Sequence, residues 1–272
     1  ILIFSSVSSI IVLPFIAYFY HSQIFNISSN NFIILLIIGF LSALAFYFYL
    51  RAMDIEEASV IIPLFQFDPV FGYILSYFIL KESLSINQIL ASVLILIGII
   101  LLSVEIDMEN KLKLKKRALF LVAISSFFFA LNGVLFKKLA LVDSFWVSIF
   151  WQYTGLTVFG IFILIFYKKF RQGFILMITA PRLKILSLNI ISEILYILGG
   201  LANNFALLIA PVALVFVVNS YQSLFVFTAG VFFTIFVPKF VSEKISREHF
   251  FHKLVSIIII IIGSYLLYSS SS

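Results

Sequence analysis

Two acidic residues, Asp68 and Glu193, stand well inside long apolar stretches of the sequence. An ionisable side chain at membrane depth costs at least about 2.5–3.5 kcal/mol on insertion scales, so such a residue is a candidate for substrate or proton binding. Asp68 precedes Pro69, which cannot donate a backbone hydrogen bond and disfavours helical geometry at the residue before it. A kink there would free a carbonyl beside the carboxyl, an arrangement that suits a substrate amine or a proton. The alternative is a protonated Asp68 that only stabilises the kink.

Uncharged polar side chains gather at a similar depth. Burying an amide without a hydrogen-bond partner costs a few kcal/mol, so these groups should face one another or a wet cavity rather than lipid. The predicted binding residues besides Asp68 and Glu193 are Gln66, Asn132, Gln152, Asn203, Asn219 and Gln222. The same polar group of the sequence includes Tyr153, Asn204, Ser220 and Tyr221. Asn219 and Gln222 are three residues apart and can share one helical face. Packing between helices is the alternative role for each single member.

Several kinds of chemistry have no support in the sequence. Cysteine is absent, which excludes disulfides, thiolate metal sites and cysteine nucleophiles. His249 and His252 share a helical face, but no Asp or Cys beside them indicates a metal. The phosphate loop of ATPases, HExxH and GxSxG are also missing. We therefore expect no catalytic residues, no metal and no cofactor, and we do not expect an enzyme.

The composition is that of a polytopic membrane protein. Hydrophobic residues make up 63% and charged residues 11% of the 272 residues, against roughly 45–50% and about 25% in soluble domains. Apolar runs of about 20 residues predict helices, because a lipid-exposed backbone must satisfy its own hydrogen bonds. We expect nine transmembrane helices, at about 1–20, 31–51, 57–80, 86–104, 118–136, 145–167, 184–208, 211–237 and 250–269.

The basic residues predict the orientation of these helices. Of the 18 Lys and Arg residues, fifteen fall on one face if the spans alternate as predicted, and only Lys81, Lys137 and Lys138 fall on the other. Loops rich in Lys and Arg stay in the cytoplasm. The basic connector 105–117 is therefore expected in the cytoplasm and Ser272 outside. The net charge of +6 is explained by this topology, so no nucleic-acid partner is expected.

Two halves of the sequence match one another. Ala52 pairs with Ala206 and Phe71 with Phe225 at a constant offset of 154 residues, and IGIILL at 97–102 pairs with IGSYLL at 262–267. We expect a first repeat at 1–104, the connector, and a second repeat at 118–272. With four and five spans, the first repeat would lack a helix upstream of Ile1. An odd number of helices per repeat inverts the second copy, a common plan of transporters. The alternative is a duplication that only built a stable bundle.

The run ALAFYFYLRAMDIEEASVIIPLFQFDPVFGYILSYFILKESLSINQILASVLILIGIILL at 43–102 resembles an EamA domain of the drug/metabolite transporter superfamily. Its features are a short acidic turn, a helix with a central Pro69, a turn at Glu82 and a last helix that contains Ile-Gly. The second copy is similar but has Ser223 in place of Pro69. The resemblance implies ten helices in two repeats around a central cavity, and a substrate such as an amino acid, another metabolite or a drug. It also implies cytoplasmic termini, opposite to the charge count.

These observations favour a secondary transporter in the cell membrane that moves a small solute by alternating access. The second, third, fifth, seventh and eighth spans would line the cavity, and the fourth and ninth would lie at the periphery, where they could join two copies into a homodimer. Proton coupling and facilitated diffusion both stay open. The rival functions are an integral membrane enzyme that acts on a lipid or polyprenyl substrate and a non-transporting assembly subunit.

Overall fold

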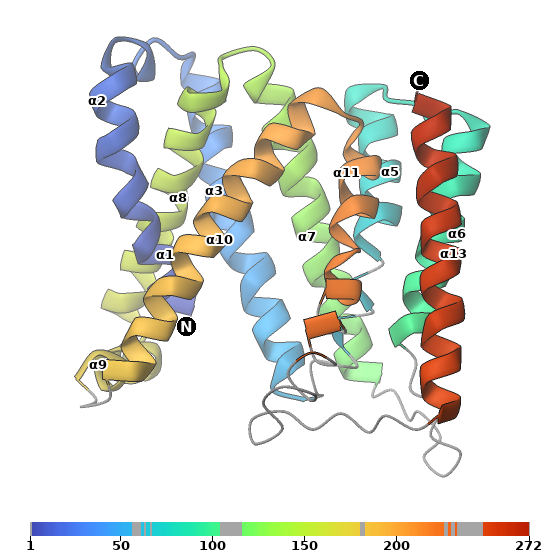
Figure 1. Cartoon of the computed structure of the whole chain (residues 1–272). Helices are drawn as coiled ribbons and strands as arrows, with labels where there is room; N and C mark the ends of the chain where they lie inside the picture. The colour runs from blue at the N-terminus through green and yellow to red at the C-terminus, as the bar shows by residue number, and fades with distance from the viewer. Residues whose placement is uncertain are drawn as a thin grey trace. The chain divides into compact units, whose positions relative to one another are not determined.

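The computed structural model of the chain is helical throughout the residues that it describes, with no strand among them (Figure 1). The described residues are 2–55, 61–62, 64–65, 67–103, 116–179, 183–225, 228–229, 232 and 247–271. The predicted all-α class is confirmed. Helices form here because backbone N–H and C=O groups in lipid have no water to bind and must pair within their own segment.

Among the residues that the structure describes, five helical segments are long and apolar enough to cross a membrane. The first, Leu2–Ile24, combines α1 (Leu2–Ser8), the 3-10 turn η1 (Ser9–Ile11) and α2 (Val12–Ile24). The others are α3 (Ser29–Met53), α7 (Lys116–Ala140), α8 (Phe145–Phe166) and the part Ser187–Ile209 of α10 (Leu183–Ile209). The chain is therefore a membrane protein, as its composition predicted.

The remaining predicted spans coincide with four helices whose apolar parts, within the described residues, are 10–17 residues long. These are α5 (Phe67–Leu80), α6 (Ile86–Ser103), α11 (Val212–Asn219) and α13 (Arg247–Ser271). The helix α9 (Lys168–Thr179), which begins with two lysines, lies between α8 and α10 in the chain. The number of nine spans stays a prediction.

The structure places Asp68 and Pro69 near the start of a helix in the predicted third span. The helix α5 begins at Phe67, so Asp68 and Pro69 lie in its first turn. The physical reason is that proline has no N–H to donate, and the first helical turn is the place where that N–H has no intrahelical acceptor.

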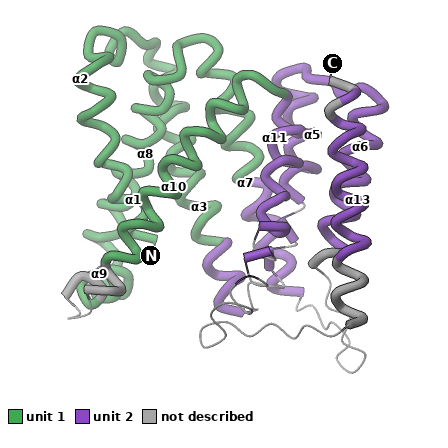
Figure 2. The backbone as a smooth tube through the Cα atoms, viewed as in Figure 1, with its two compact units in different colours: residues 1–48, 128–210 green, residues 49–127, 211–272 purple. Residues whose placement is uncertain are grey.

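Contacts divide the chain into two units, which Figure 2 draws in green and purple. The first unit comprises Ile1–Phe48 and Phe128–Ala210. Within it, α1 and α2 pack along α8. Gly39 of α3 and Gly155 of α8 let two backbones meet, because a methyl group on Gly39 would collide with the Gln152 carbonyl oxygen and one on Gly155 with the Leu36 carbonyl oxygen. The close approach of α3 and α8 positions the polar groups described below.

The second unit comprises Tyr49–Phe127 and Pro211–Ser272. In this unit α5 packs against α11, and α6 packs against α13. Both pairs are antiparallel, as their course through Figure 1 shows. The core between α6, α11 and α13 contains the buried side chains of Ile95, Ile99, Val217 and Ile260.

Candidate functional site

A chain of hydrogen-bonded side chains crosses the first unit. The Asn132 side-chain amide donates to the Ile38 carbonyl at 2.8 Å and to the Ser42 hydroxyl at 2.6 Å. The Gln152 amide donates to Asn132 Oδ1 at 3.4 Å, and the Asn204 amide donates to Gln152 Oε1 at 3.0 Å. We call Ser42, Asn132, Gln152 and Asn204 the polar chain.

Each member of the polar chain comes from a different helix: α3, α7, α8 and α10. The three amides are 8%, 5% and 7% exposed, in the order Asn132, Gln152, Asn204. Buried amides are stable in a protein only when they are hydrogen-bonded, so these contacts tie the four helices together. The structure thus brings the predicted residues Asn132 and Gln152 together, with Gln152 in the middle of the chain.

The adjacent residues Asn203 and Asn204 differ in their contacts because their side chains point in different directions from α10. Both lie in α10, where successive side chains point about 100° apart. Asn204 faces Gln152, whereas the predicted residue Asn203 is half-buried on a neighbouring face. Asn204 belonged to the polar group of the sequence, but was not among the predicted binding residues. Its amide type was visible in the sequence, and the rotation of α10 was not.

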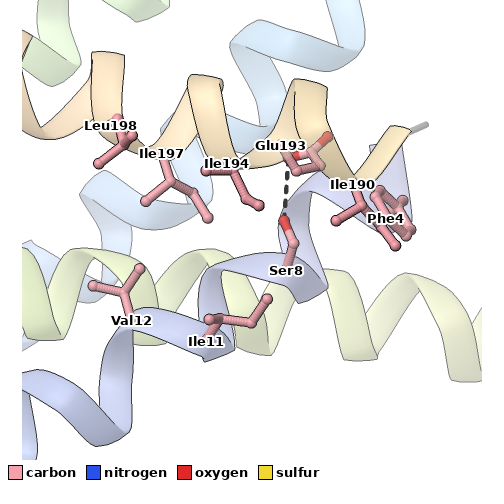
Figure 3. Close-up of a pocket in the computed structure, with 9 residues that line it drawn as sticks. All are labelled: Phe4, Ser8, Ile11, Val12, Ile190, Glu193, Ile194, Ile197 and Leu198. Atoms are coloured by element: carbon pink, nitrogen blue, oxygen red, sulfur yellow. Dashed lines mark hydrogen bonds between the residues drawn. The ribbon is translucent and has the colours of Figure 1, made fainter. Parts of the chain in front are cut away.

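Glu193 of α10 is held by two serines of the first helical segment. The Ser5 hydroxyl donates to Glu193 Oε1, and the Ser8 hydroxyl donates to Glu193 Oε2 at 3.1 Å. These serines were not predicted as site residues. Figure 3 shows the Ser8 contact at the edge of an apolar groove of about 260 Å³. The groove is lined by Phe4, Ser8, Ile11, Val12, Ile190, Glu193, Ile194, Ile197 and Leu198.

The same serine-rich segment is also attached to α8. The Ser9 hydroxyl lies 2.7 Å from the Thr157 hydroxyl and donates to the Ser6 carbonyl at 2.6 Å. This contact occurs where the helix tightens into η1. The signal in the sequence was four serines, at positions 5, 6, 8 and 9, in an otherwise apolar run. Such serines are expected to bond across helices when they lie in a membrane.

Asp68 lies in the second unit, in the first turn of α5. Its Oδ1 atom is buried and has no hydrogen-bond partner among the described residues, and the same holds for the hydroxyl of Ser126 in α7. Ser126 lies beside the Asp68 carboxyl. Next to this pair, Phe71 and Phe127 pack edge to face with ring centroids 5.8 Å apart. Asp68 and Ser126 thus form a small polar pair in an apolar setting, and such a pair can receive a bound group.

Two further predicted residues lie at the end of α11 and just beyond it. Asn219, the last residue of α11, and Gln222 both have exposed side chains in the second unit. Gln66 lies outside the described residues. The convergence of all predicted residues on one cavity therefore stays a prediction.

The described helices and their buried polar side chains define a helical membrane protein with polar groups inside its helix packing. Residues 1–104 match the model of the EamA-like transporter family, which belongs to the drug/metabolite transporter superfamily. The resemblance that the sequence showed is confirmed over this region. Members of the family are membrane transporters and not enzymes. No curated protein matches the chain.

The matched region contains only part of the candidate site. It includes Asp68 and the serines that hold Glu193, together with Ser42 of the polar chain. Asn132, Gln152, Glu193 and Asn204 lie beyond residue 104. Roles for these four residues therefore depend on their contacts in this chain.

Proposed function

We propose that this protein is a secondary transporter that moves a small metabolite, amino acid or drug-like solute across the cell membrane by alternating access. The observation that carries the proposal is the match of residues 1–104 to the EamA-like transporter family. Helices that can cross a membrane and a buried polar chain support it further, because a solute that crosses the bilayer needs polar groups at depth.

The polar chain is the proposed contact for the polar part of the solute. Its central link, from Gln152 to Asn132, is 3.4 Å long and is therefore weaker than the 3.0 Å link from Asn204 to Gln152. A hydroxyl or amide of a solute can replace this long link, because it can accept from the Gln152 amide and donate to Asn132 Oδ1. Gln66, Asn203, Asn219 and Gln222 stay proposed contacts for the solute, as the sequence predicts.

Asp68 is the proposed binding group for a proton or for a cationic part of the solute. The buried carboxyl oxygen of Asp68 lies beside the Ser126 hydroxyl, so the two groups together could hold a bound proton or ammonium. Facilitated diffusion would need no titrating group, and the pH dependence of transport separates the two mechanisms.

The proposed architecture is nine spans in two inverted repeats, 1–104 and 118–272, joined by the basic connector 105–117. The antiparallel packing of α5 with α11 and of α6 with α13 supports it, because these are the helices that the sequence repeat pairs. On α6 and α13, apolar side chains such as Val93, Ile97, Ile261 and Ile262 are exposed. This surface would face lipid or a second copy of the protein.

The test begins with the substrate. Metabolites released and retained by cells with and without the protein are compared, and candidates are then assayed as counterflow in proteoliposomes. We expect exchange of at least one candidate solute, reduced by more than about tenfold in Gln152→Leu. The matched control is Thr154→Val, on the same helix, whose hydroxyl bonds only to its own helix at Phe150. If purified protein that inserts normally exchanges none of the candidates, the proposal of transport is wrong.

A further inference from the structure

The groove beside Glu193 differs from the polar chain because most of the side chains that line it are apolar. One wall is formed by side chains at positions 4, 8, 11 and 12 of the first helical segment, and the other by positions 190, 193, 194, 197 and 198 of α10 (Figure 3). The wall on α10 follows one helical face from Ile190 to Leu198, a rise of about 12 Å at 1.5 Å per residue. Glu193 and Ser8 are the polar residues of this lining, and the rest are apolar.

Glu193 retains hydrogen-bonding capacity in this groove. A carboxylate offers about four acceptor positions, and the hydroxyls of Ser5 and Ser8 occupy two of them, one on each oxygen. Both donors are neutral hydroxyls, so neither brings a positive charge to the Glu193 carboxyl. Glu193 makes no ion pair with a Lys or Arg among the residues that the structure describes. The titratable side chain that interacts with it electrostatically is Tyr196, one turn further along α10.

The groove is open along one side. Ile11 is 68% exposed, Ile194 is 51% exposed and Leu198 is 58% exposed, although all three are apolar. Because these side chains belong to helices that can cross a membrane, a molecule that partitions into the bilayer can reach the groove laterally. A strongly hydrated solute without an apolar part would gain little from this surface.

From this combination we propose that the groove binds an amphipathic organic amine, with its ammonium group on the Glu193 carboxylate and its ring or alkyl body along Ile11, Ile194 and Leu198. The ammonium group donates to the acceptor positions that Ser5 and Ser8 leave open, and the apolar body covers the exposed isoleucines and leucine. A role in transport rests on the proposed function, for which this inference names the substrate class; binding itself does not require that function.

Binding is tested on the full-length protein in lipid nanodiscs by titration calorimetry. The probe is 2-phenylethylamine, which is protonated at neutral pH, and the matched neutral compound is 2-phenylethanol. We expect the amine to bind and the alcohol to bind about ten- to a hundredfold more weakly, since it lacks the charge-assisted contact. Glu193→Gln keeps the size of the side chain and removes the charge, so it should weaken amine binding by a similar factor and leave alcohol binding unchanged.

Two further variants test whether the amine binds in the groove or only responds to the negative charge of the protein. Ile194→Trp adds volume to a half-exposed side chain of the groove, so it should abolish amine binding while the protein stays folded. Asp54→Asn removes a negative charge from a residue that is 68% exposed and paired with Arg51, so it should bind the amine as the wild type does. The inference is overturned if amine and alcohol bind equally, if Glu193→Gln binds the amine normally, or if the wild-type protein binds no amine.

Amine flux in proteoliposomes distinguishes this inference from the proposed function. If the protein binds the amine but transports no solute, the groove is supported as a binding site and the proposed transport function is wrong. If the protein transports another solute but binds no amine, only the inference that the groove binds an amine is wrong.

Discussion

Gly98 of α6 and Gly263 of α13 make the same contact from opposite sides of one interface. A methyl group on Gly98 would lie 2.8 Å from Ile260 Cγ1, and one on Gly263 would lie 2.8 Å from Ile95 Cγ1. The sequence repeat pairs the two glycines at an offset of 165 residues, and the same offset pairs Ile95 with Ile260. An operation that superposes each repeat on the other would therefore place the Gly98–Ile260 contact on the Gly263–Ile95 contact.

An exchange of this kind between two antiparallel helices is a two-fold rotation about an axis that passes between them. It is the relationship that an inverted repeat requires, and it supports the proposed architecture from within a single unit. The glycines allow it because the backbone nitrogen of each facing isoleucine would lie only 3.2 Å and 3.1 Å from the added methyl groups.

Substitution of either glycine tests this interface. Gly98→Ala and Gly263→Ala should each lower the free energy of unfolding by about 1–3 kcal/mol, because the helices must separate to admit the methyl group. Thermal unfolding of the detergent-solubilised protein, followed by size-exclusion chromatography, measures the effect. The two losses should be alike, since the two contacts are equivalent.

Gly199→Ala is the matched control for both glycines. A methyl group there would meet nothing within 4 Å, and alanine is a better helix former than glycine, so this variant should be at least as stable as the wild type. Equal tolerance of alanine at all three positions would mean that α6 and α13 are not in close backbone contact.

A second prediction concerns the middle of the polar chain. Gln152→Leu leaves Asn132 Oδ1 and the Asn204 amide without their partner, and each buried polar group left unpaired costs about 1–3 kcal/mol. Ser42→Ala should cost less, because the Asn132 amide keeps the Ile38 carbonyl. Unfolding midpoints in nanodiscs measure both variants. Gln152→Leu as stable as Ser42→Ala would show that the chain does not join the helices.

The sequence was enough to predict the class of fold and the kinds of residue in the site. Composition alone predicted a helical membrane protein, because no other fold satisfies the backbone in lipid over such long apolar runs. Amides inside apolar runs were recognisable as groups that need partners, and Asn132 and Gln152 became partners of one another.

The partners that lie far away in the chain could not be predicted. Ser5 and Ser8 reach Glu193 across 188 and 185 residues, and that contact depends on how α1 packs beside α10. The choice between Asn203 and Asn204 depends on the rotation of α10 about its axis, for which a nearly uniform apolar helix carries little periodic signal. The sequence repeat pairs Gly98 with Gly263. It does not show which isoleucines face these glycines, because the neighbouring residues are apolar too.

A third prediction concerns two adjacent lysines at the end of α7. Lys137 is 7% exposed, and its ammonium group donates to the Ala210 carbonyl at 2.7 Å, next to the last residue of α10. A positive charge is favourable at a helix C-terminus. Lys137→Met should therefore destabilise the protein by about 1.5–3 kcal/mol, the range of hydrogen bonds to charged groups. The exposed neighbour provides the control, because Lys138→Met should change the unfolding midpoint little. Similar effects of the two substitutions would contradict a specific role for Lys137.

A fourth prediction is the orientation of the protein in the membrane. From the distribution of its basic residues we expect the 105–117 connector in the cytoplasm and Ser272 outside. The protein has no native cysteine, so single cysteines at Ser272 and within the connector can be labelled in intact cells with an impermeant thiol reagent. We expect labelling at position 272 and protection in the connector. The reverse pattern would establish the orientation with a cytoplasmic C-terminus that the family resemblance implies.

The last prediction is that Asp68 contributes more to transport than to folding. Asp68→Asn keeps the size of the side chain and its ability to form hydrogen bonds, but it cannot ionise. If Asp68 binds a proton or a cationic solute beside Ser126, the variant should insert normally and lose most transport, or lose the pH dependence of transport. If it only stabilises the kink predicted at Pro69, insertion and transport should both stay close to wild type. Uptake into proteoliposomes across a pH series measures the difference, with Asp54→Asn as the control for an exposed carboxylate. Normal transport by Asp68→Asn at every pH would reject this residue as the binding group and leave Glu193 as the acidic residue to test.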